Sequence, residues 1–399
     1  MRPAKGLARA DYDDPTRGAP LRECQFSQVV ARAATQPGRR RTGTPGSSTG
    51  TVAGVRGAAD DPDEPFDPDE PFDPDEPFDP AGGPRPSLGD APLVSIVVPT
   101  HISEPPFLAE TLASVVAQER ANWEVIVVDD GSPDAGALVE LAAVDRRIRV
   151  VRQDRGGVAR ARNFGLKHAR GELVAFLDYD DLWYPGHLSS TVDALAAHAD
   201  AVAAFTACDV ITGADKKNRR VIRVVGPTTR RTIYSGGNRP YINTLVARRE
   251  AVAGVGGFDP AFDGADDLDL VHKLAERGRF VYVDEVTVTY RPHDHNWSRD
   301  TRSLASAGDR VLAAHLNRLR TAGDAEAAAG LAASRRGARR YYSERALRDA
   351  FDALKSGHIR LCAALLWWAV RFSPGGAATV LVQGTVRRLS SRGPGRCPR

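Results

Sequence analysis

Cysteine is scarce in this chain of 399 residues, which contains four cysteines spread from Cys24 to Cys397. No two of them form a CxxC pair, so the sequence indicates neither a zinc knuckle nor a disulfide framework. We therefore expect the protein to work in a reducing cytoplasm.

Long apolar runs are also missing. The longest uninterrupted candidate, residues 361–370, has ten residues and ends at Arg371, which is too short to span a bilayer. Residues 1–30 lack the apolar segment of a secretory signal. A cytoplasmic protein without a membrane-spanning helix is the expectation.

A strong excess of charge is absent, because the formal net charge is only +3. This balance gives no reason to expect nucleic-acid binding. The charge is unevenly placed, however, since residues 1–45 and 386–399 are rich in Arg and residues 60–79 are strongly acidic. Such segments usually are solvated tails, and contact with an anionic membrane surface is the alternative.

Large apolar residues are sparse in residues 1–90, which we predict to be a disordered tail. Within it, residues 61–78 repeat Asp-Pro-Asp-Glu-Pro-Phe three times. Two prolines per repeat forbid regular helix and sheet, and the charges oppose collapse. A stiff acidic spacer is the favoured interpretation, and a motif that presents its phenylalanines to a partner is the other.

Apolar strand patterns alternate with helical patterns from residue 92 onward. Strands are expected at 93–99, 123–128, 148–152 and 173–177, with helices at 106–119, 135–144 and 157–168. This alternation predicts an α/β fold with a Rossmann-like, mostly parallel sheet built from βαβ units.

The pattern is less regular further along. We expect a helix at 187–197, a strand at 201–206, a hairpin or loop at 209–233, a helix at 266–276 and a strand at 280–290. From about residue 303 the pattern is helical. The predicted organisation is a tail at 1–90, an α/β domain at 91–300 and a helical C-terminal region with a basic tail at 301–399.

Three carboxylates follow the fourth predicted strand, in the run Asp178-Tyr179-Asp180-Asp181. Ligands of open α/β sheets bind outside the carboxyl ends of the strands, where crowded carboxylates repel one another unless a cation neutralises them. Carboxylate oxygens suit Mg²⁺ or Mn²⁺, often shared with substrate phosphates. The run therefore predicts a divalent metal that holds a diphosphate.

Two further motifs fall at the same predicted sheet edge. The second strand ends in Asp129 and Asp130, whose side chains could accept hydrogen bonds from a nucleoside, although Asp-Gly is also a common turn. The first strand ends in Pro99 and Thr100. These four residues are candidates for nucleotide binding.

The segment before the fourth strand combines a Gly156-Gly157 pair with Arg160 and Arg162. The arginines could meet phosphate or could be exposed helix charges. The segment has neither the GxGxxG spacing of a dinucleotide fold nor the pattern of a P-loop.

Four of these motifs, taken together, resemble the glycosyltransferases of family 2, which have a GT-A fold. The motifs are Ser95–Thr100, Val125–Ser132, Gly157–Gly165 and Leu177–Asp181, and they occur in the family's order. Single motifs of this kind carry little weight, whereas four in order over about 90 residues are specific.

The resemblance continues to about residue 299. Gly256–Asp259 and Asp266–Leu270 are similar to the family's GGFD and Glu-Asp-Trp-Asp-Leu segments, with Asp266 in place of Glu and Leu268 in place of Trp. Tyr290–Ser298 is similar to a late YRxHxxNxS segment.

The resemblance implies roles for the donor side of the site. Asp180 of the DXD motif would bind Mg²⁺ or Mn²⁺, and Asp178 would contact the ribose or the metal's water shell, with Asp181 in support. Arg162 and Asn163 would bind the nucleotide sugar. His293 would reach the metal or the diphosphate, although a lone histidine in a loop is as often structural.

On the acceptor side, the resemblance makes Asp267 the general base and the reaction an inverting one. Judged without the resemblance, the acids at 266, 267 and 269 would be read as helix caps. The expected function is an inverting, metal-dependent glycosyltransferase that moves a sugar from a nucleotide-diphosphate sugar to a hydroxyl of a glycan or lipid-linked acceptor, in cell-surface polysaccharide or glycolipid synthesis.

Two alternatives stay open. A sugar nucleotidyltransferase would need a Gly-rich basic loop after the first strand, where residues 99–106 carry none. A non-catalytic binding protein with the GT-A fold would have no use for the three aspartates.

Residues 361–372 could form a packed helix or, with Trp367 and Trp368, an interfacial membrane helix.

Overall fold

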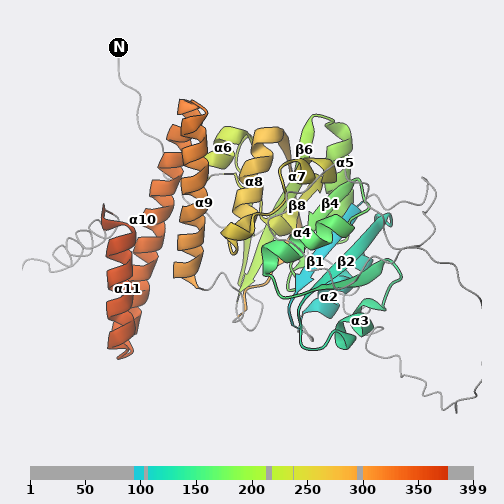
Figure 1. Ribbon diagram of the computed structural model, residues 1–399, viewed down its shortest axis with the longest axis horizontal. Helices are drawn as coiled ribbons and strands as arrows, with labels where there is room; N and C mark the ends of the chain where they lie inside the picture. The colour runs from blue at the N-terminus through green and yellow to red at the C-terminus, as the bar shows by residue number, and fades with distance from the viewer. Residues whose placement is uncertain (1–93, 103–106, 213–217, 237, 294–299, 376–399) are drawn as a thin grey trace, which may run out of the picture. The chain divides into compact units, whose positions relative to one another are not determined.

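The computed structural model describes residues 94–102, 107–212, 218–236, 238–293 and 300–375 (Figure 1). The predicted tail at 1–90 with its acidic repeat lies outside these residues. So does the basic C-terminal tail.

The first half of the sheet is parallel, as the βαβ pattern predicts. Strands β1 (Val94–Thr100), β2 (Trp123–Asp130), β3 (Ile148–Gln153) and β4 (Leu173–Phe176) lie in the order β3-β2-β1-β4. All three pairings are parallel, and Thr100 lies opposite Asp129. The carboxyl ends of β1 and β2 therefore meet at one edge of the sheet.

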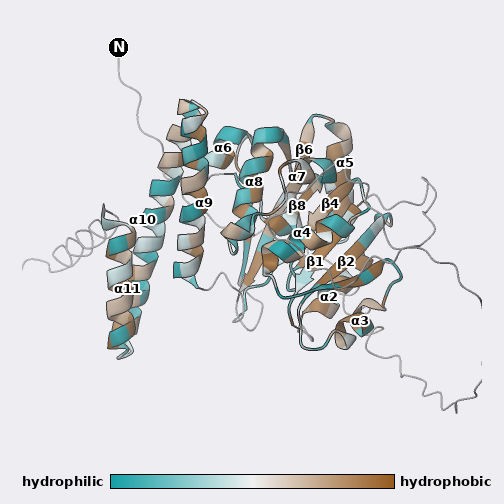
Figure 2. Ribbon diagram, in the orientation of Figure 1, coloured by the Kyte–Doolittle hydropathy of each residue, from teal (hydrophilic) through white to brown (hydrophobic). Residues whose placement is uncertain are grey.

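Alternating strand residues face two apolar layers. Val94, Ile96 and Val98 pack with α2 (Leu108–Val116), α3 (Gly136–Ala142) and α5 (His187–Ala197). Val97 and the opposite residues of β2 pack with α4 (Val158–His168), α7 (Arg249–Gly254) and α8 (Asp266–Arg277). Figure 2 shows the resulting apolar colouring along β1 and β2. The sheet is thus buried on both faces, as parallel sheets require.

Helix α4 packs against the sheet at Gly165 without room for a side chain. A Cβ atom at this position would collide with Val97 Cγ1 and lie 3.0 Å from Val128 Cγ2. Glycine therefore sets the separation between α4 and strands β1 and β2.

The second half of the sheet contains most of the antiparallel pairing. β8 (Leu245–Arg248) runs antiparallel to β4 and to β6 (Ala201–Thr212). β6 pairs in parallel with β9 (Arg279–Tyr290), and β7 (Asn218–Ile222) forms a hairpin with β6. β5 (Leu182–Trp183) runs antiparallel to β9. The α/β fold class is confirmed, with a sheet that is mixed overall and parallel in its first half.

Short elements complete this part of the chain: α6 (Arg230–Tyr234), η1 (Ile242–Thr244) and η2 (Pro260–Phe262). The helical C-terminal pattern forms α9 (Thr301–Thr321), α10 (Ala325–Lys355) and α11 (Ile359–Phe372). Apolar residues of α9 and α10 share a cluster with Tyr234 of α6 and Leu268 of α8. Among the described helices, none is both long and apolar enough to cross a membrane.

Candidate active site

A cleft of about 2290 Å³ opens at the carboxyl edge of the parallel strands. Its walls come from the ends of β1, β2 and β4, from the start of α8, and from α9 and α10. Most of the predicted site residues line it: Pro99, Thr100, Asp130, Arg162, Asp178, Asp180, Asp181, Asp267 and His293. Asp129 and Asn163 are not among the lining residues.

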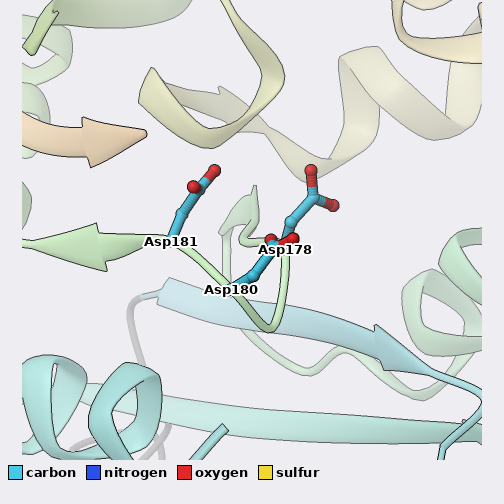
Figure 3. A group of neighbouring side chains, drawn as sticks. All are labelled: Asp178, Asp180 and Asp181. Carbon is cyan, nitrogen blue, oxygen red and sulfur yellow. The ribbon is translucent and has the colours of Figure 1, made fainter. Parts of the chain in front are cut away.

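The three aspartates that follow β4 form a compact cluster. Each offers a carboxylate oxygen that lies within 4.8 Å of the others, and Figure 3 shows them on one turn of the chain. The turn is closed by a hydrogen bond of 3.1 Å from Asp181 N to Asp178 O. Sequence spacing alone thus brings the three carboxylates together.

The three side chains differ in their surroundings. Burial, followed by the charge of Asp178, raises the pKa of Asp180, although Asp180 Oδ2 lies 2.7 Å from His293 Nε2. Burial raises the pKa of Asp181 more strongly, since Asp180 and Asp178 add their repulsion. Both shifts express the cost of burying and crowding carboxylates, which a bound cation would relieve.

The cluster fits a hard divalent cation. Asp181 is fully buried and accepts hydrogen bonds from Asn243 Nδ2 and, at 3.0 Å, from Arg291 N. Its oxygens are therefore engaged within the protein. Asp178 and Asp180, which Arg162 and His293 also contact, would supply carboxylate oxygens beside the His293 imidazole, a donor set suited to Mg²⁺ or Mn²⁺.

Arg162 joins the two sides of the cleft. Its guanidinium donates from Nη2 to Asp178 Oδ1 at 2.8 Å and from Nη1 to Asp266 Oδ2 at 2.6 Å. Burial opposes the charge on Arg162, but the carboxylates of Asp266 and Asp178 outweigh it and raise its pKa. In turn, burial raises the pKa of Asp266 to about 6, with Arg162 limiting the rise and Asp267 adding to it.

The acids of the first turn of α8 have separate partners. Asp266 pairs with Arg162, and Asp269 lies 2.7 Å from His315 Nε2 of α9. Asp267 is half-buried, accepts a hydrogen bond from Leu268 N at 2.7 Å and lines the cleft. Of these three acids, only Asp267 forms no ion pair and no hydrogen bond to another side chain among the residues that the structure describes. Its carboxylate is therefore available at the cleft.

The two aspartates at the end of β2 hold the neighbouring loops. Asp129 is fully buried, accepting from Ser132 N at 2.8 Å and from Arg152 Nη1 at 2.7 Å. Asp130 accepts from Gly156 N at 2.7 Å and Gly157 N at 2.9 Å, which fixes the entry into α4. Only Asp130 also lines the cleft.

Asn163 joins α4 to the Gly-Gly-Phe segment. Its Nδ2 donates to Phe258 O at 2.7 Å, and its Oδ1 accepts from Phe258 N at 2.9 Å. Gly257 has a φ of 62°, a backbone conformation that favours glycine. The amide therefore positions the segment that leads into η2 and α8.

Two residues at the site had no assigned role from sequence. Arg291 donates from Nε to Asp180 O and from Nη1 to Glu110, and it lies 4.6 Å from the Phe107 ring centroid. Asn243 binds Asp181, and its backbone carbonyl accepts from Trp183 Nε1 at 2.8 Å. Arg291 lies in the YRxH segment, whereas Asn243 had no such motif to mark it.

Comparison with known proteins identifies the class to which this fold and site belong. Residues 95–252 match the family model described as glycosyl transferase family 2. The recognition of this family from the motifs is confirmed over these residues.

Individual proteins show the same relationship. The chain is 33% identical over 242 residues to the O-antigen biosynthesis protein RfbC of Myxococcus xanthus, covering 58% of this chain and 18% of RfbC. It is 40% identical over 101 residues to the UDP-Glc:alpha-D-GlcNAc-diphosphoundecaprenol beta-1,3-glucosyltransferase WfgD of Escherichia coli, covering 25% and 40% of the two chains. The chain thus spans less than half the length of these curated relatives.

A solved structure supports the fold. The mannosyltransferase PcManGT from Pyrobaculum calidifontis, in complex with GDP-Man and Mn²⁺, superposes with a TM-score of 0.50 at 22% identity. The match covers 79% of this chain and 84% of that one. The predicted GT-A type of α/β fold is therefore confirmed.

Proposed function

We propose that the protein is an inverting, metal-dependent glycosyltransferase. It moves a sugar from a nucleotide-diphosphate sugar to a hydroxyl acceptor during the synthesis of a cell-surface polysaccharide or glycolipid. The observation that carries this proposal is the pair of contacts that the buried Arg162 makes with Asp178 and Asp266. They hold a carboxylate cluster suited to a divalent cation and a cleft-lining carboxylate, Asp267, against the same cavity.

The donor half is built around Asp178, Asp180 and His293, which would hold Mg²⁺ or Mn²⁺. When bound there, the cation supplies Lewis-acid stabilisation of the departing diphosphate. Pro99, Thr100 and Asp130 would receive the nucleoside, since they line the cleft at the ends of β1 and β2. Asp129, Arg162 and Asn163 act on donor binding through the residues that they position.

In the acceptor half, Asp267 takes the proton of the attacking hydroxyl. A carboxylate with one short hydrogen bond to its own helix keeps lone pairs available for that proton. Attack from the side opposite the leaving group inverts the anomeric carbon, so that no enzyme carboxylate is needed as a nucleophile.

The names of the relatives favour surface glycans as products. RfbC is named for O-antigen biosynthesis, and WfgD for transfer to a diphosphoundecaprenol-linked sugar. A lipid-linked acceptor would place the enzyme at the inner face of a membrane. The outer face of α11 suits such peripheral contact, because Ile359 is 70% and Trp367 66% exposed.

The alternatives are less well supported. A nucleotidyltransferase would need cationic residues directly after β1, where His101 and Ile102 stand instead. A non-catalytic binding protein would gain nothing from the repulsion stored among three aspartates.

A donor screen tests the proposed function. Nucleoside diphosphate release is measured for each nucleotide sugar with Mn²⁺ or Mg²⁺, and one donor is expected to be turned over. Asp180→Ala should abolish the metal-dependent activity, whereas Asp193→Ala, on the exposed side of α5, should retain it. If no donor is bound or turned over with either metal, the enzyme assignment fails.

A further inference from the structure

The cleft is larger than a donor site requires. Small-molecule pockets usually enclose roughly 300–1000 Å³, whereas this cleft encloses about 2290 Å³. The additional space lies beyond Asp267, between the segment 231–242 and the helices α9 and α10. Figure 1 shows α10 on the far side of α9 and α6 from the sheet.

The face of α10 toward this space carries small residues first and aromatic and cationic residues further along the helix. Residues at spacings of three and four are small over several turns: Gly330, Ala333, Ser334, Gly337 and Ala338. The same face then ends in Tyr341, Tyr342 and Arg345. Small residues keep the cleft open, and the aromatic and cationic residues lie at one end of it.

The carboxylates in this stretch are already neutralised. Glu326 lies 2.9 Å from Arg231, and Asp309 lies 2.7 Å from Arg335. By contrast, neither Arg239 nor Arg345 forms an ion pair or a hydrogen bond with any residue that the structure describes. Two uncompensated cations from different parts of the chain therefore line one cleft.

The charges of both arginines act on one residue that also lines the cleft, Tyr342. Burial raises the pKa of Tyr342, and both Arg239 and Arg345 act against that rise. Arg239 also acts on Tyr241, whose pKa is raised by burial and, further, by the charge of Asp267. Arg239 therefore acts on Tyr342 together with Arg345 and on Tyr241 together with the proposed catalytic base.

A buried polar group lines the same region. His272 of α8 is 1% exposed, and its Nδ1 has no hydrogen-bond partner among the described residues. The ring packs edge-on against Tyr234 and His315. Buried polar atoms are normally satisfied, so this one indicates a ligand or water in the cleft.

We propose that Arg239 and Arg345 form a binding subsite for an anionic group of the acceptor, either a phosphate or a carboxylate, while the acceptor hydroxyl reaches Asp267. Arginine binds both groups through paired hydrogen bonds. The role as an acceptor subsite rests on the proposed function, but the anion site can be measured without any reaction.

Isothermal titration calorimetry of the full chain, in EDTA and without donor, tests the subsite. The probes are glucose 1-phosphate, glucuronic acid, decyl phosphate and neutral methyl glucoside. We expect an anionic probe to bind and methyl glucoside not to bind. Preference among the three anions distinguishes a sugar phosphate, an acidic glycan and a lipid phosphate as the source of the charge.

Arg239→Gln and Arg345→Gln should each weaken binding of the anion by roughly tenfold. Arg336→Gln is the matched control, because Arg336 is an exposed arginine of α10 that does not line the cleft. Arg239→Lys should retain part of the affinity. Unchanged affinity in both glutamine variants, or equal binding of methyl glucoside, would overturn the subsite.

The anion subsite and the proposed function are contradicted by different results. Loss of anion binding in the arginine variants, together with no turnover of any donor, supports the subsite and contradicts the proposed function. Donor turnover by the wild type, together with unchanged anion binding in the arginine variants, supports the proposed function and contradicts the subsite.

Discussion

Arg162 Nη1 lies 2.6 Å from Asp266 Oδ2, and both side chains are buried. The two residues are 104 positions apart, one on α4 and the other at the start of α8. The second contact of Arg162, with Asp178, extends this pairing to the carboxylate cluster. The distance between the proposed donor and acceptor halves is therefore fixed by a single guanidinium.

Replacing Arg162 should be costly for stability. Arg162→Gln leaves two carboxylates without their cation, and breaking a buried ion pair typically costs about 3–5 kcal/mol. Urea unfolding at neutral pH measures the loss. Arg160→Gln, on the same helix and outside the cleft, is the control and should change the free energy of unfolding by less than about 0.5 kcal/mol. Equal stability of the two variants would contradict the bridging role.

The pKa of Asp266, raised to about 6, predicts a pH dependence of stability. Between about pH 4 and pH 6, the folded state keeps a proton that the unfolded chain has released, since an unfolded Asp titrates near 3.9. The free energy of unfolding should therefore fall as pH rises through this window and then level off.

Asp266→Asn isolates this contribution. The difference in unfolding free energy between wild type and variant should shift by about 2–3 kcal/mol across the window, because one pKa unit corresponds to 1.36 kcal/mol. Urea titrations at pH 4.5 and pH 7 provide the measurement. A difference that stays constant with pH would show that Asp266 titrates normally.

Asp267→Asn should remove the proposed general base. General-base catalysis typically contributes roughly 10²–10⁴-fold, so kcat should fall by that factor while the urea midpoint stays unchanged. Asp259→Asn is the control, because Asp259 caps η2 and does not line the cleft. Retention of full transfer activity by Asp267→Asn would exclude the residue as the base.

The parallel half of the fold could be predicted because its pattern is local. Apolar runs such as 123–128 and 173–177 alternate with helical periods, and the structure forms each of these elements within a few residues of the expected bounds. β8 was not predicted, since four residues carry too little pattern to define a strand. Strands were expected at 201–206 and 280–290, but β8, which pairs with both β4 and β6, was missing from the expectation.

At the site, too, only the features that depend on residues close in sequence could be predicted. Asp178, Asp180 and Asp181 are close in sequence, and their proximity follows from one turn. Asp266, the buried partner of Arg162, and Phe258, the partner of Asn163, lie about a hundred residues away, so sequence could not show these contacts within the protein. Their roles toward a donor remain predictions.

Gly165 should tolerate no side chain. Gly165→Ala places a methyl group against Val97 and Val128, and overpacking of this kind costs about 1–3 kcal/mol. Gly254→Ala is the matched control, because its Cβ would meet no atom within 4 Å. Urea unfolding should show a loss for the first variant and little change for the second. Equal stabilities would mean that α4 can move away from the sheet without cost.

The exposed apolar face of α11 predicts membrane contact. Trp367 is 66% exposed and Arg371 lies 5.5 Å from its ring, an arrangement suited to the interface of an anionic bilayer. In sedimentation with phosphatidylglycerol vesicles, Trp367→Ser should weaken binding by roughly tenfold, consistent with losing the burial of a large aromatic side chain. Val225→Ser, which alters a residue that is 87% exposed elsewhere, should bind as wild type does. If Trp367→Ser bound the phosphatidylglycerol vesicles as wild type does, the face would belong to another partner. The same would follow if the wild type bound phosphatidylcholine vesicles equally well.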